Sequence, residues 1–220
     1  MKQTVYIPEK LSEITLRQYQ EFLKDESKAV EIFCGIDDIK NVSKKDYEFL
    51  VESISKVLNE LPGELVTRFR VNNVEYGFIP NLDNMTLGEF IDLDDSLGDD
   101  KQLLRSMNVL CRPITKTIAD KYDIEPYTAV INNDLLDMPL DAVLSSHVFF
   151  WNLSNQLLEI TQNFLDHQEQ AIQKDPRLQN LLMKNGVGIS HLKSSLTETS
   201  QGLKKLLTKN LLPPSFILHT

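Results

Sequence analysis

The fold of this chain is decided by the stretch TRFRVNNVEYGFIPNLDNMTLGEFIDL at residues 67–93. Its first half alternates apolar and polar residues on either side of Asn72-Asn73, a dipeptide that tolerates the positive φ angles of a tight turn. This pattern predicts an antiparallel β-hairpin over residues 66–79. Pro80 ends the second strand, because proline cannot continue the ladder.

The second half of the stretch predicts a helix start. Thr86 has the side chain of an N-cap residue, and Glu89, three residues later, completes a capping box. The same signature occurs at Thr15 and Gln18. Helices are therefore expected to begin at both threonines.

Most of the remaining chain shows apolar residues at helical spacing. This spacing predicts helices near residues 15–25, 28–33, 43–61, 101–110 and 139–174. Residues 92–100 are expected to form an acidic loop, and residues 114–130, which have no clear period, a loop with a helical turn. The predicted fold class is mainly α (α+β), a helical domain with one small hairpin and a long C-terminal helix. At 1.5 Å per residue that helix is roughly 50 Å long, a length typical of a helix that spans its whole domain or projects into a partner.

Charge is distributed unevenly along the 220 residues, of which 41% are apolar and sufficient for a core. The net charge is −9; from Lys174 onward seven basic and two acidic residues give +5, which leaves −14 for the residues before. This predicts an acidic domain over residues 1–174 and a basic helical appendage over residues 175–220. The lysines of the appendage are dispersed, without interleaved aromatics, which favours docking to protein over contact with DNA.

The compartment is indicated by the cysteines and by the absence of targeting patterns. Cys34 and Cys111 each lie among apolar residues, where buried free thiols are expected. The N-terminus lacks the apolar region of a secretory leader, and no window approaches the 18 or so apolar residues of a membrane span. A protein of a reducing cytoplasm is expected.

The acidic segment can be tested as a calcium loop. Asp92, Asp94 and Ser96 take its first, third and fifth positions, but Leu97 stands where glycine is needed and Leu103 where a bidentate glutamate is needed. The motif fails.

No other pattern predicts a catalytic, cofactor-binding or metal-binding residue. The four histidines, His147, His167, His191 and His219, are scattered rather than set at metal-ligand spacing. His147 is expected to be a hydrogen-bonded histidine inside a helix. Gly186-Val187-Gly188 lacks the strand and helix of a phosphate-binding loop.

Six residues are candidates for protein contacts. Three successive aromatics on a helix cannot all face one core, and aromatics dominate interface energetics. An arginine beside a proline at the end of a helix could anchor a carboxylate, for example one from the acidic loop, although a structural ion pair is the default. Together with two aromatics of the hairpin, the candidates are Phe149, Phe150, Trp151, Arg112, Tyr76 and Phe78.

Several phrases occur in a characteristic order: ITLRQYQEFL at 14–23, FCGI at 33–36, Tyr76, LGEFIDL at 87–93 and CRPI at 111–114. With these phrases the chain resembles uncharacterised proteins of tailed phages, especially phages of Bacteroidetes hosts including the crAss-like group. The likeness covers residues 5–165. It implies a virion-morphogenesis protein.

The resemblance leads to three functional hypotheses. The first is a non-enzymatic virion component, structural or cargo, that is made in the host cytoplasm and acts through contacts with other phage structural proteins. It would be a homo-oligomer or present in many copies, since distributed apolar burial suits polyvalent assembly. The second is a tail-assembly chaperone that is absent from the mature virion. The third is an enzyme of unrecognised type.

Overall fold

The computed structural model describes residues 5–97 and 99–174. These residues fall into two compact units, with Val148 the last described residue of the first and Phe149 the first of the second. The described chain combines helices with a four-stranded antiparallel sheet, which confirms a mixed α+β fold.

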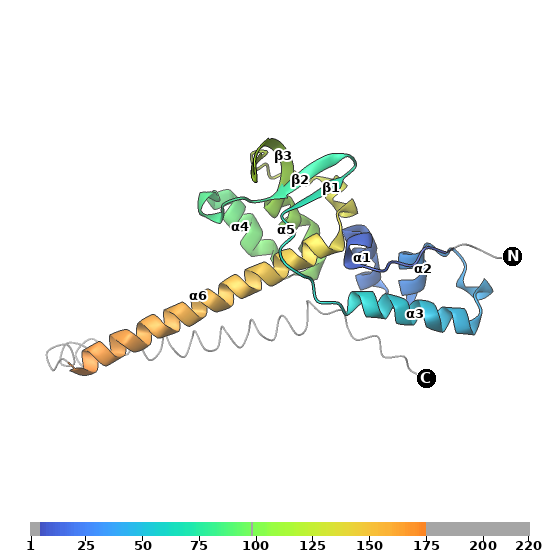
Figure 1. The fold of residues 1–220 in the computed structure, drawn as a ribbon, viewed down its shortest axis with the longest axis horizontal. Helices are drawn as coiled ribbons and strands as arrows, with labels where there is room; N and C mark the ends of the chain where they lie inside the picture. The colour runs from blue at the N-terminus through green and yellow to red at the C-terminus, as the bar shows by residue number, and fades with distance from the viewer. Residues whose placement is uncertain (1–4, 98, 175–220) are drawn as a thin grey trace. The chain divides into compact units, whose positions relative to one another are not determined.

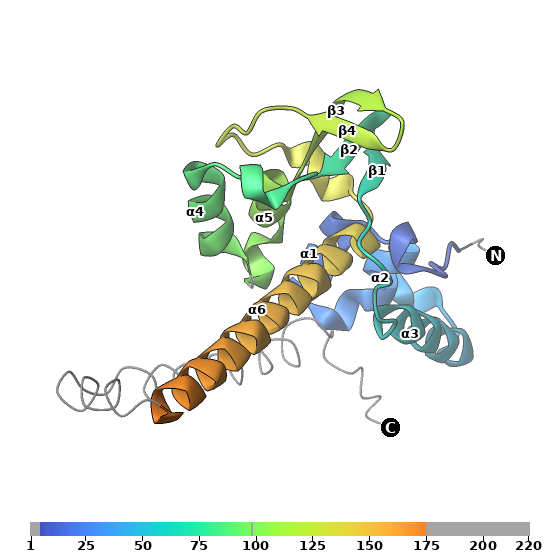
Figure 2. The ribbon, with the colours of Figure 1, turned by 60° about the vertical axis from the view of Figure 1, so that its left-hand side comes forward.

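The first unit contains two groups of helices (Figures 1 and 2). One group is α1, α2 and α3, and the other, next to the sheet, is α4 and α5. The last helix, α6, begins in this unit. The bounds are α1 (Leu16–Lys24), α2 (Ala29–Cys34), α3 (Lys44–Leu58), α4 (Leu87–Ser96), α5 (Leu103–Leu110) and α6 (Leu140–Lys174).

The sheet has the strand order β1-β2-β3-β4, with every neighbouring pair antiparallel. Its strands are β1 (Arg68–Val71), β2 (Val74–Phe78), β3 (Cys111–Ile118) and β4 (Lys121–Ile124). Asn72 and Asn73 have φ angles of 49° and 68°, as a two-residue hairpin turn requires. The predicted hairpin is confirmed, but it is half of a larger sheet.

The expectation of a loop with a helical turn at residues 114–130 was wrong for its first part, because β3 and β4 occupy residues 111–118 and 121–124. Residues 125–130 form neither helix nor strand, as expected of a loop. Two features conceal these strands. Pro113 lies inside β3, where it pairs with Tyr76 of β2, and proline usually ends a strand. The turn after Ile118 places Ala119 at a φ of 52°, without the glycine or asparagine that signals such a turn.

The expected acidic loop at residues 92–100 was also wrong in its first half. α4 continues to Ser96, because Leu93 and Ser96 lie on the buried side of the helix while Asp94 and Asp95 face outward. The Ser96 hydroxyl donates to the Asp92 carbonyl oxygen at 2.7 Å. Buried residues at helical spacing thus stabilise α4 through this acidic stretch.

The predicted helix starts are confirmed. Both Thr15 and Thr86 form complete capping boxes, with Gln18 and Glu89 as the reciprocal partners. Gly35 ends α2 with a φ of 64°, the left-handed conformation expected at that position.

The start of α1 is joined to the start of α6 by a short antiparallel bridge between Thr15 and Pro139. The Leu16 N–H donates to the Met138 carbonyl oxygen at 3.0 Å, and the Leu140 N–H donates to the Ile14 carbonyl oxygen at 2.8 Å. The side chains at both starts are buried; Leu16, Met138 and Leu140 are completely covered. This bridge connects the beginning and the end of the first unit.

The side chain of Tyr122 in β4 packs over Gly77 of β2. A β-carbon built on Gly77 would lie 2.3 Å from Cε2 of Tyr122, so only glycine leaves room for the ring. The Tyr122 hydroxyl lies 2.7 Å from the Phe78 carbonyl oxygen and 3.0 Å from that of Thr67. The Arg68 guanidinium lies 4.5 Å from the centre of the ring. The β3–β4 hairpin therefore packs back onto β1 and β2.

The second unit is described for residues 149–174, all within α6. This helix extends to Lys174, as the apolar spacing predicts. The predicted basic appendage at 175–220 lies outside the described residues, so the boundary at residue 174 stays a prediction.

The two glycines Gly77 and Gly88 provide a matched test of the packing. Gly77→Ala is expected to lower the free energy of unfolding by about 1–3 kcal/mol, because the new methyl group overlaps the Tyr122 ring. Gly88→Ala is expected to raise it by roughly 0.5 kcal/mol, because Gly88 lies in α4 with open space around its α-carbon. Urea unfolding measures both. Shifts of the same sign would contradict this packing.

Candidate functional site

The candidate site is built around a buried ion pair between Glu89 of α4 and Arg112 of β3. The Arg112 Nη1 atom lies 2.6 Å from Glu89 Oε1, and the side chains are only 12% and 6% exposed. The other Glu89 oxygen accepts a hydrogen bond from the Thr86 N–H at 2.6 Å. One carboxylate therefore completes the helix cap and joins α4 to the sheet.

The charge state of Glu89 results from opposing effects. Burial is the largest influence and raises its pKa, but the hydrogen bond from the Thr86 backbone and the charge of Arg112 together outweigh it, so the pKa lies below its usual value. The carboxylate is therefore ionised at neutral pH. A buried anion of this kind holds its partner firmly, because losing the partner leaves an uncompensated charge.

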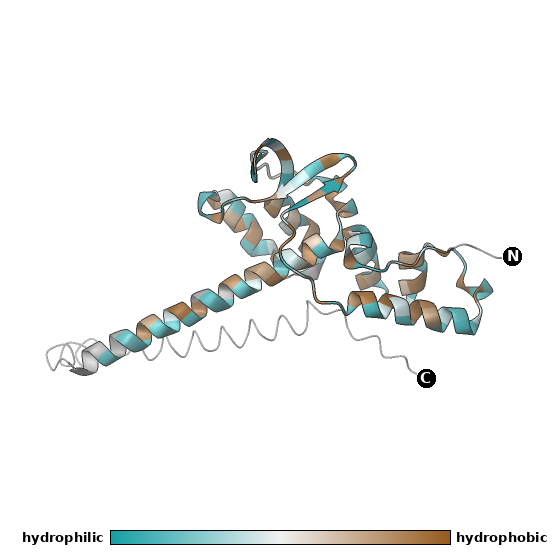
Figure 3. Ribbon diagram, viewed as in Figure 1, coloured by the Kyte–Doolittle hydropathy of each residue, from teal (hydrophilic) through white to brown (hydrophobic). Residues whose placement is uncertain are grey.

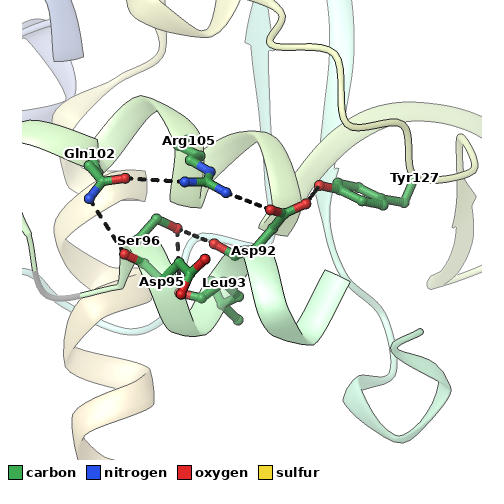
Figure 4. Close-up of polar contacts among 7 residues, drawn as sticks. All are labelled: Asp92, Leu93, Asp95, Ser96, Gln102, Arg105 and Tyr127. Atoms are coloured by element: carbon green, nitrogen blue, oxygen red, sulfur yellow. Dashed lines mark hydrogen bonds and ion pairs between the residues drawn. The ribbon is translucent and has the colours of Figure 1, made fainter. Parts of the chain in front are cut away.

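A second set of polar contacts extends from the ion pair along α4 (Figure 4). The Tyr127 ring lies 5.8 Å from the Arg112 guanidinium, and its hydroxyl donates to Asp92 Oδ2. The other Asp92 oxygen lies 2.6 Å from Nη2 of Arg105 in α5. The Gln102 side chain lies beside Arg105. Two arginines and one tyrosine thus bind the inner side of α4 to β3, to α5 and to the segment after β4.

The electrostatics of this second set agree with its geometry. The hydrogen bond from Tyr127 and the ion pair with Arg105 hold the pKa of Asp92 below its usual range. Burial and the hydrogen bond to Asp92 raise the pKa of Tyr127 to about 12. Tyr127 is therefore neutral and Asp92 charged across the physiological range, so the contacts do not change with pH there.

Arg112 also borders two hollows in the surface. The larger, of about 250 Å³, is lined by residues that include Asn81, Asn84, Glu89, Tyr122 and Asp123. The smaller, of about 80 Å³, lies toward Asn108 and Asn132. Cys111 and Glu125 both line the smaller hollow, but burial raises the pKa of the Cys111 thiol to about 12, so the thiol is protonated at neutral pH. In the larger hollow Glu89 is engaged by Arg112 and by the Thr86 N–H. Among the described residues, no group of three His, Cys, Asp or Glu side chains is placed to hold a metal ion.

The outward side of α4 is apolar. Leu87, Phe90 and Ile91 are 74%, 58% and 50% exposed. They stand at the i, i+3 and i+4 positions of one helix and therefore share a face. We call these three residues the outer face of α4. Figure 3 shows hydrophobic and hydrophilic residues mixed along this helix.

Sequence reasoning did not identify the outer face of α4. Its apolar residues follow the capping box directly, and this position is normally occupied by residues that turn toward the core. The helix turns the other way because Glu89, Leu93 and Ser96 take the buried side. One signal was available in the sequence: Glu89, Leu93 and Ser96 stand at the i, i+4 and i+7 positions of one helix face. That this face is the buried one depends on Arg112 of β3, which the pattern of α4 does not reveal.

Of the predicted contact residues, Arg112 is placed in the ion pair described above, with Glu89 of the capping box as its partner and not a carboxylate of segment 92–100. Tyr76 and Phe78 are buried, at 2% and 3% exposure. The Tyr76 hydroxyl accepts a hydrogen bond from the Asn132 side chain at 2.9 Å. Their predicted role as an interaction edge stays a prediction.

The aromatic run lies in the second unit. Phe149, Phe150 and Trp151 are half-buried, and the two phenylalanine rings meet edge to face with centres 5.3 Å apart. The indole N–H of Trp151 is buried and has no hydrogen-bond partner among the described residues. The contact role of this run stays a prediction.

His147 and the cysteines follow their predictions. The His147 Nδ1–H donates to the Val143 carbonyl oxygen at 2.9 Å, which confirms a hydrogen-bonded helix histidine. Burial lowers its pKa, against the opposing effect of that hydrogen bond. Cys34 and Cys111 are buried free thiols, and burial raises the pKa of Cys111 to about 12.

The comparisons with protein-family models, curated proteins and solved structures find no match to this chain. In the described part of the chain, no helix has the length and apolar character needed to cross a membrane.

Two arginines provide a matched test of the buried ion pair. Arg112→Met is expected to lower the free energy of unfolding by about 3 kcal/mol, because it leaves the Glu89 charge buried without its partner. Arg105→Met is expected to lower it by less than about 1 kcal/mol, because the Arg105–Asp92 pair is 39% and 25% exposed. Adding Glu89→Gln to Arg112→Met should recover more than half of the loss. Equal losses for the two single variants would contradict the assignment.

The ion pair of Glu89 also makes the stability of the fold depend on pH in the acid range. Because the folded-state pKa of Glu89 is lowered, its stabilisation is complete above the usual carboxyl range, near 4, and is lost as the pH falls through the folded pKa. Glu89→Gln removes this component but keeps an oxygen for the Thr86 N–H. Urea unfolding between pH 7 and pH 3 should therefore show a shallower loss of stability in the variant. Parallel curves for variant and wild type would argue against the role of Glu89.

Proposed function

We propose that this chain is a non-enzymatic structural or cargo component of a tailed-phage virion. It would be present in several copies and act through protein–protein contacts. The resemblance of residues 5–165 to proteins of tailed phages supplies the biological setting. The physical support comes from the outer face of α4.

The outer face of α4 is the observation that carries the proposal. A helix in a monomeric protein normally turns its i, i+3 and i+4 apolar residues inward. In α4 the inward side is taken by Glu89, Leu93 and Ser96, while Leu87, Phe90 and Ile91 remain half or more exposed. Contiguous exposed apolar residues rimmed by polar ones are typical of protein interaction sites.

The charged residues around α4 support a structural use. Arg112 and Arg105 bind Glu89 and Asp92 on the inner side of the helix, so they fix its orientation. A helix that is held in this way can present its outer face without reordering when a partner binds. Such preorganisation reduces the entropy that association has to overcome.

A tail-assembly chaperone is the alternative, since a transient partner could use the same face. The two roles differ in one observable, namely whether the chain remains in the mature particle.

The test is mass spectrometry of purified particles from a phage that encodes either the wild-type chain or a variant of α4. The wild-type chain should be present at several copies per particle. Phe90→Asp should reduce incorporation by roughly 30-fold, because an interfacial aromatic of this kind contributes about 2 kcal/mol or more. Phe49→Asp is the control, since Phe49 lies on α3 and is 59% exposed.

Absence of the wild-type chain from purified particles would overturn the virion role and support the chaperone. Equally reduced incorporation of the Phe49→Asp and Phe90→Asp variants would show that α4 is not the contact surface.

A further inference from the structure

The outer face of α4 has an acidic end. Asp94 follows Leu87 by seven residues and continues the same stripe of the helix, and Asp95 lies beside it; both are exposed. The carboxylates on the inner side, Glu89 and Asp92, are compensated by arginines. Between Leu87 and Ser96 the chain has no basic residue. A partner of this surface therefore needs apolar groups at helical spacing together with positive charge.

The chain itself contains a segment with these properties. Residues 203–211 read LKKLLTKNL. The leucines Leu203, Leu206 and Leu207 repeat the i, i+3, i+4 spacing of the outer face of α4. Lys204, Lys205 and Lys209 lie between and beside them, with no acidic residue in the segment. The segment is therefore complementary to the surface in both apolar spacing and charge.

We propose that the outer face of α4 binds residues 203–211 of a second copy of this chain. The leucines cover Leu87, Phe90 and Ile91, and the lysines approach Asp94 and Asp95. The inference rests on the multi-copy assembly of the proposed function and names its partner. Residues 175–202 can span up to roughly 90 Å when fully extended, which is enough to reach a neighbouring molecule.

The contact is heterologous, because two different surfaces meet. Each copy then offers one segment and one α4 face, so association continues until a ring closes or a filament grows. A two-fold symmetric dimer built on one patch would not have this property. The difference decides the design of the experiment.

The test mixes two full-length variants, each defective on one side of the contact. Phe90→Asp damages the α4 face and leaves the segment intact, while Leu206→Asp damages the segment and leaves the face intact. Light scattering after size-exclusion chromatography should give masses above the 25.2 kDa monomer for the wild type and a monomer for each variant alone. An equimolar mixture should form a dimer, because one intact face meets one intact segment.

Phe49→Asp is the control and should retain the wild-type mass. Circular dichroism checks that each variant keeps its helices, which is expected because Phe90 is 58% exposed. A monomeric wild type, variants that keep the wild-type mass, or a mixture that stays monomeric would each overturn the proposal. A wild-type monomer includes the case in which the segment binds its own α4 or binds nothing.

Charge reversal tests the electrostatic part independently. Asp94→Lys with Asp95→Lys in one chain, and Lys204→Glu with Lys205→Glu in another, should each weaken self-association. Carrying all four substitutions in one chain should restore self-association, since the reversed face of one copy then meets the reversed segment of the next. Failure of this four-substitution chain to associate would count against the pairing of these charges.

The experiments distinguish failure of this contact from failure of the virion role. If the chain is absent from particles and the mixed variants still dimerise, the virion role is wrong and the contact stands. If the chain is present in particles and the mixture remains monomeric, the contact is wrong and another partner covers α4. Binding of the wild type to duplex DNA that is lost in Lys204→Glu with Lys205→Glu, without any change in mass, would assign the segment to nucleic acid and overturn the proposal.

Discussion

The structure depends on one buried carboxylate. Glu89 accepts the Thr86 N–H at the start of α4 and holds Arg112 of β3 at the same time, so a local capping rule and a long-range ion pair meet in one side chain. Because both partners are almost fully buried, removing either leaves a charge without compensation. The position of α4 against the sheet follows from this constraint.

The ion pair also explains why an apolar surface is exposed. A helix of ten residues has room for one buried stripe, and in α4 this stripe contains Glu89, Leu93 and Ser96. The apolar residues on the opposite side are left outside. The second pair, Arg105 with Asp92, secures the middle of the helix against α5. Polar contacts position α4 from its inner side, and apolar residues remain exposed on its outer face.

Local rules predicted the elements that depend on local chemistry. The Asn72-Asn73 turn, the two capping boxes and the helices were readable because each is specified by neighbours in the sequence. The strands β3 and β4 were not, because their stability comes from pairing with β2 and from the Tyr122 ring over Gly77. The outer face of α4 was missed for a related reason. Which side of an amphipathic helix is buried depends on Arg112, and periodicity carries no information about a residue in another element.

The central claim, that the Glu89–Arg112 pair positions α4, is tested most directly by native-state hydrogen exchange on Arg112→Met. The account predicts that the amides of α4 lose protection by a larger factor than the amides of α1, α2 and α3, which lose at most what the lower global stability imposes. Unchanged protection of α4, or an equal loss in both groups of helices, would contradict it.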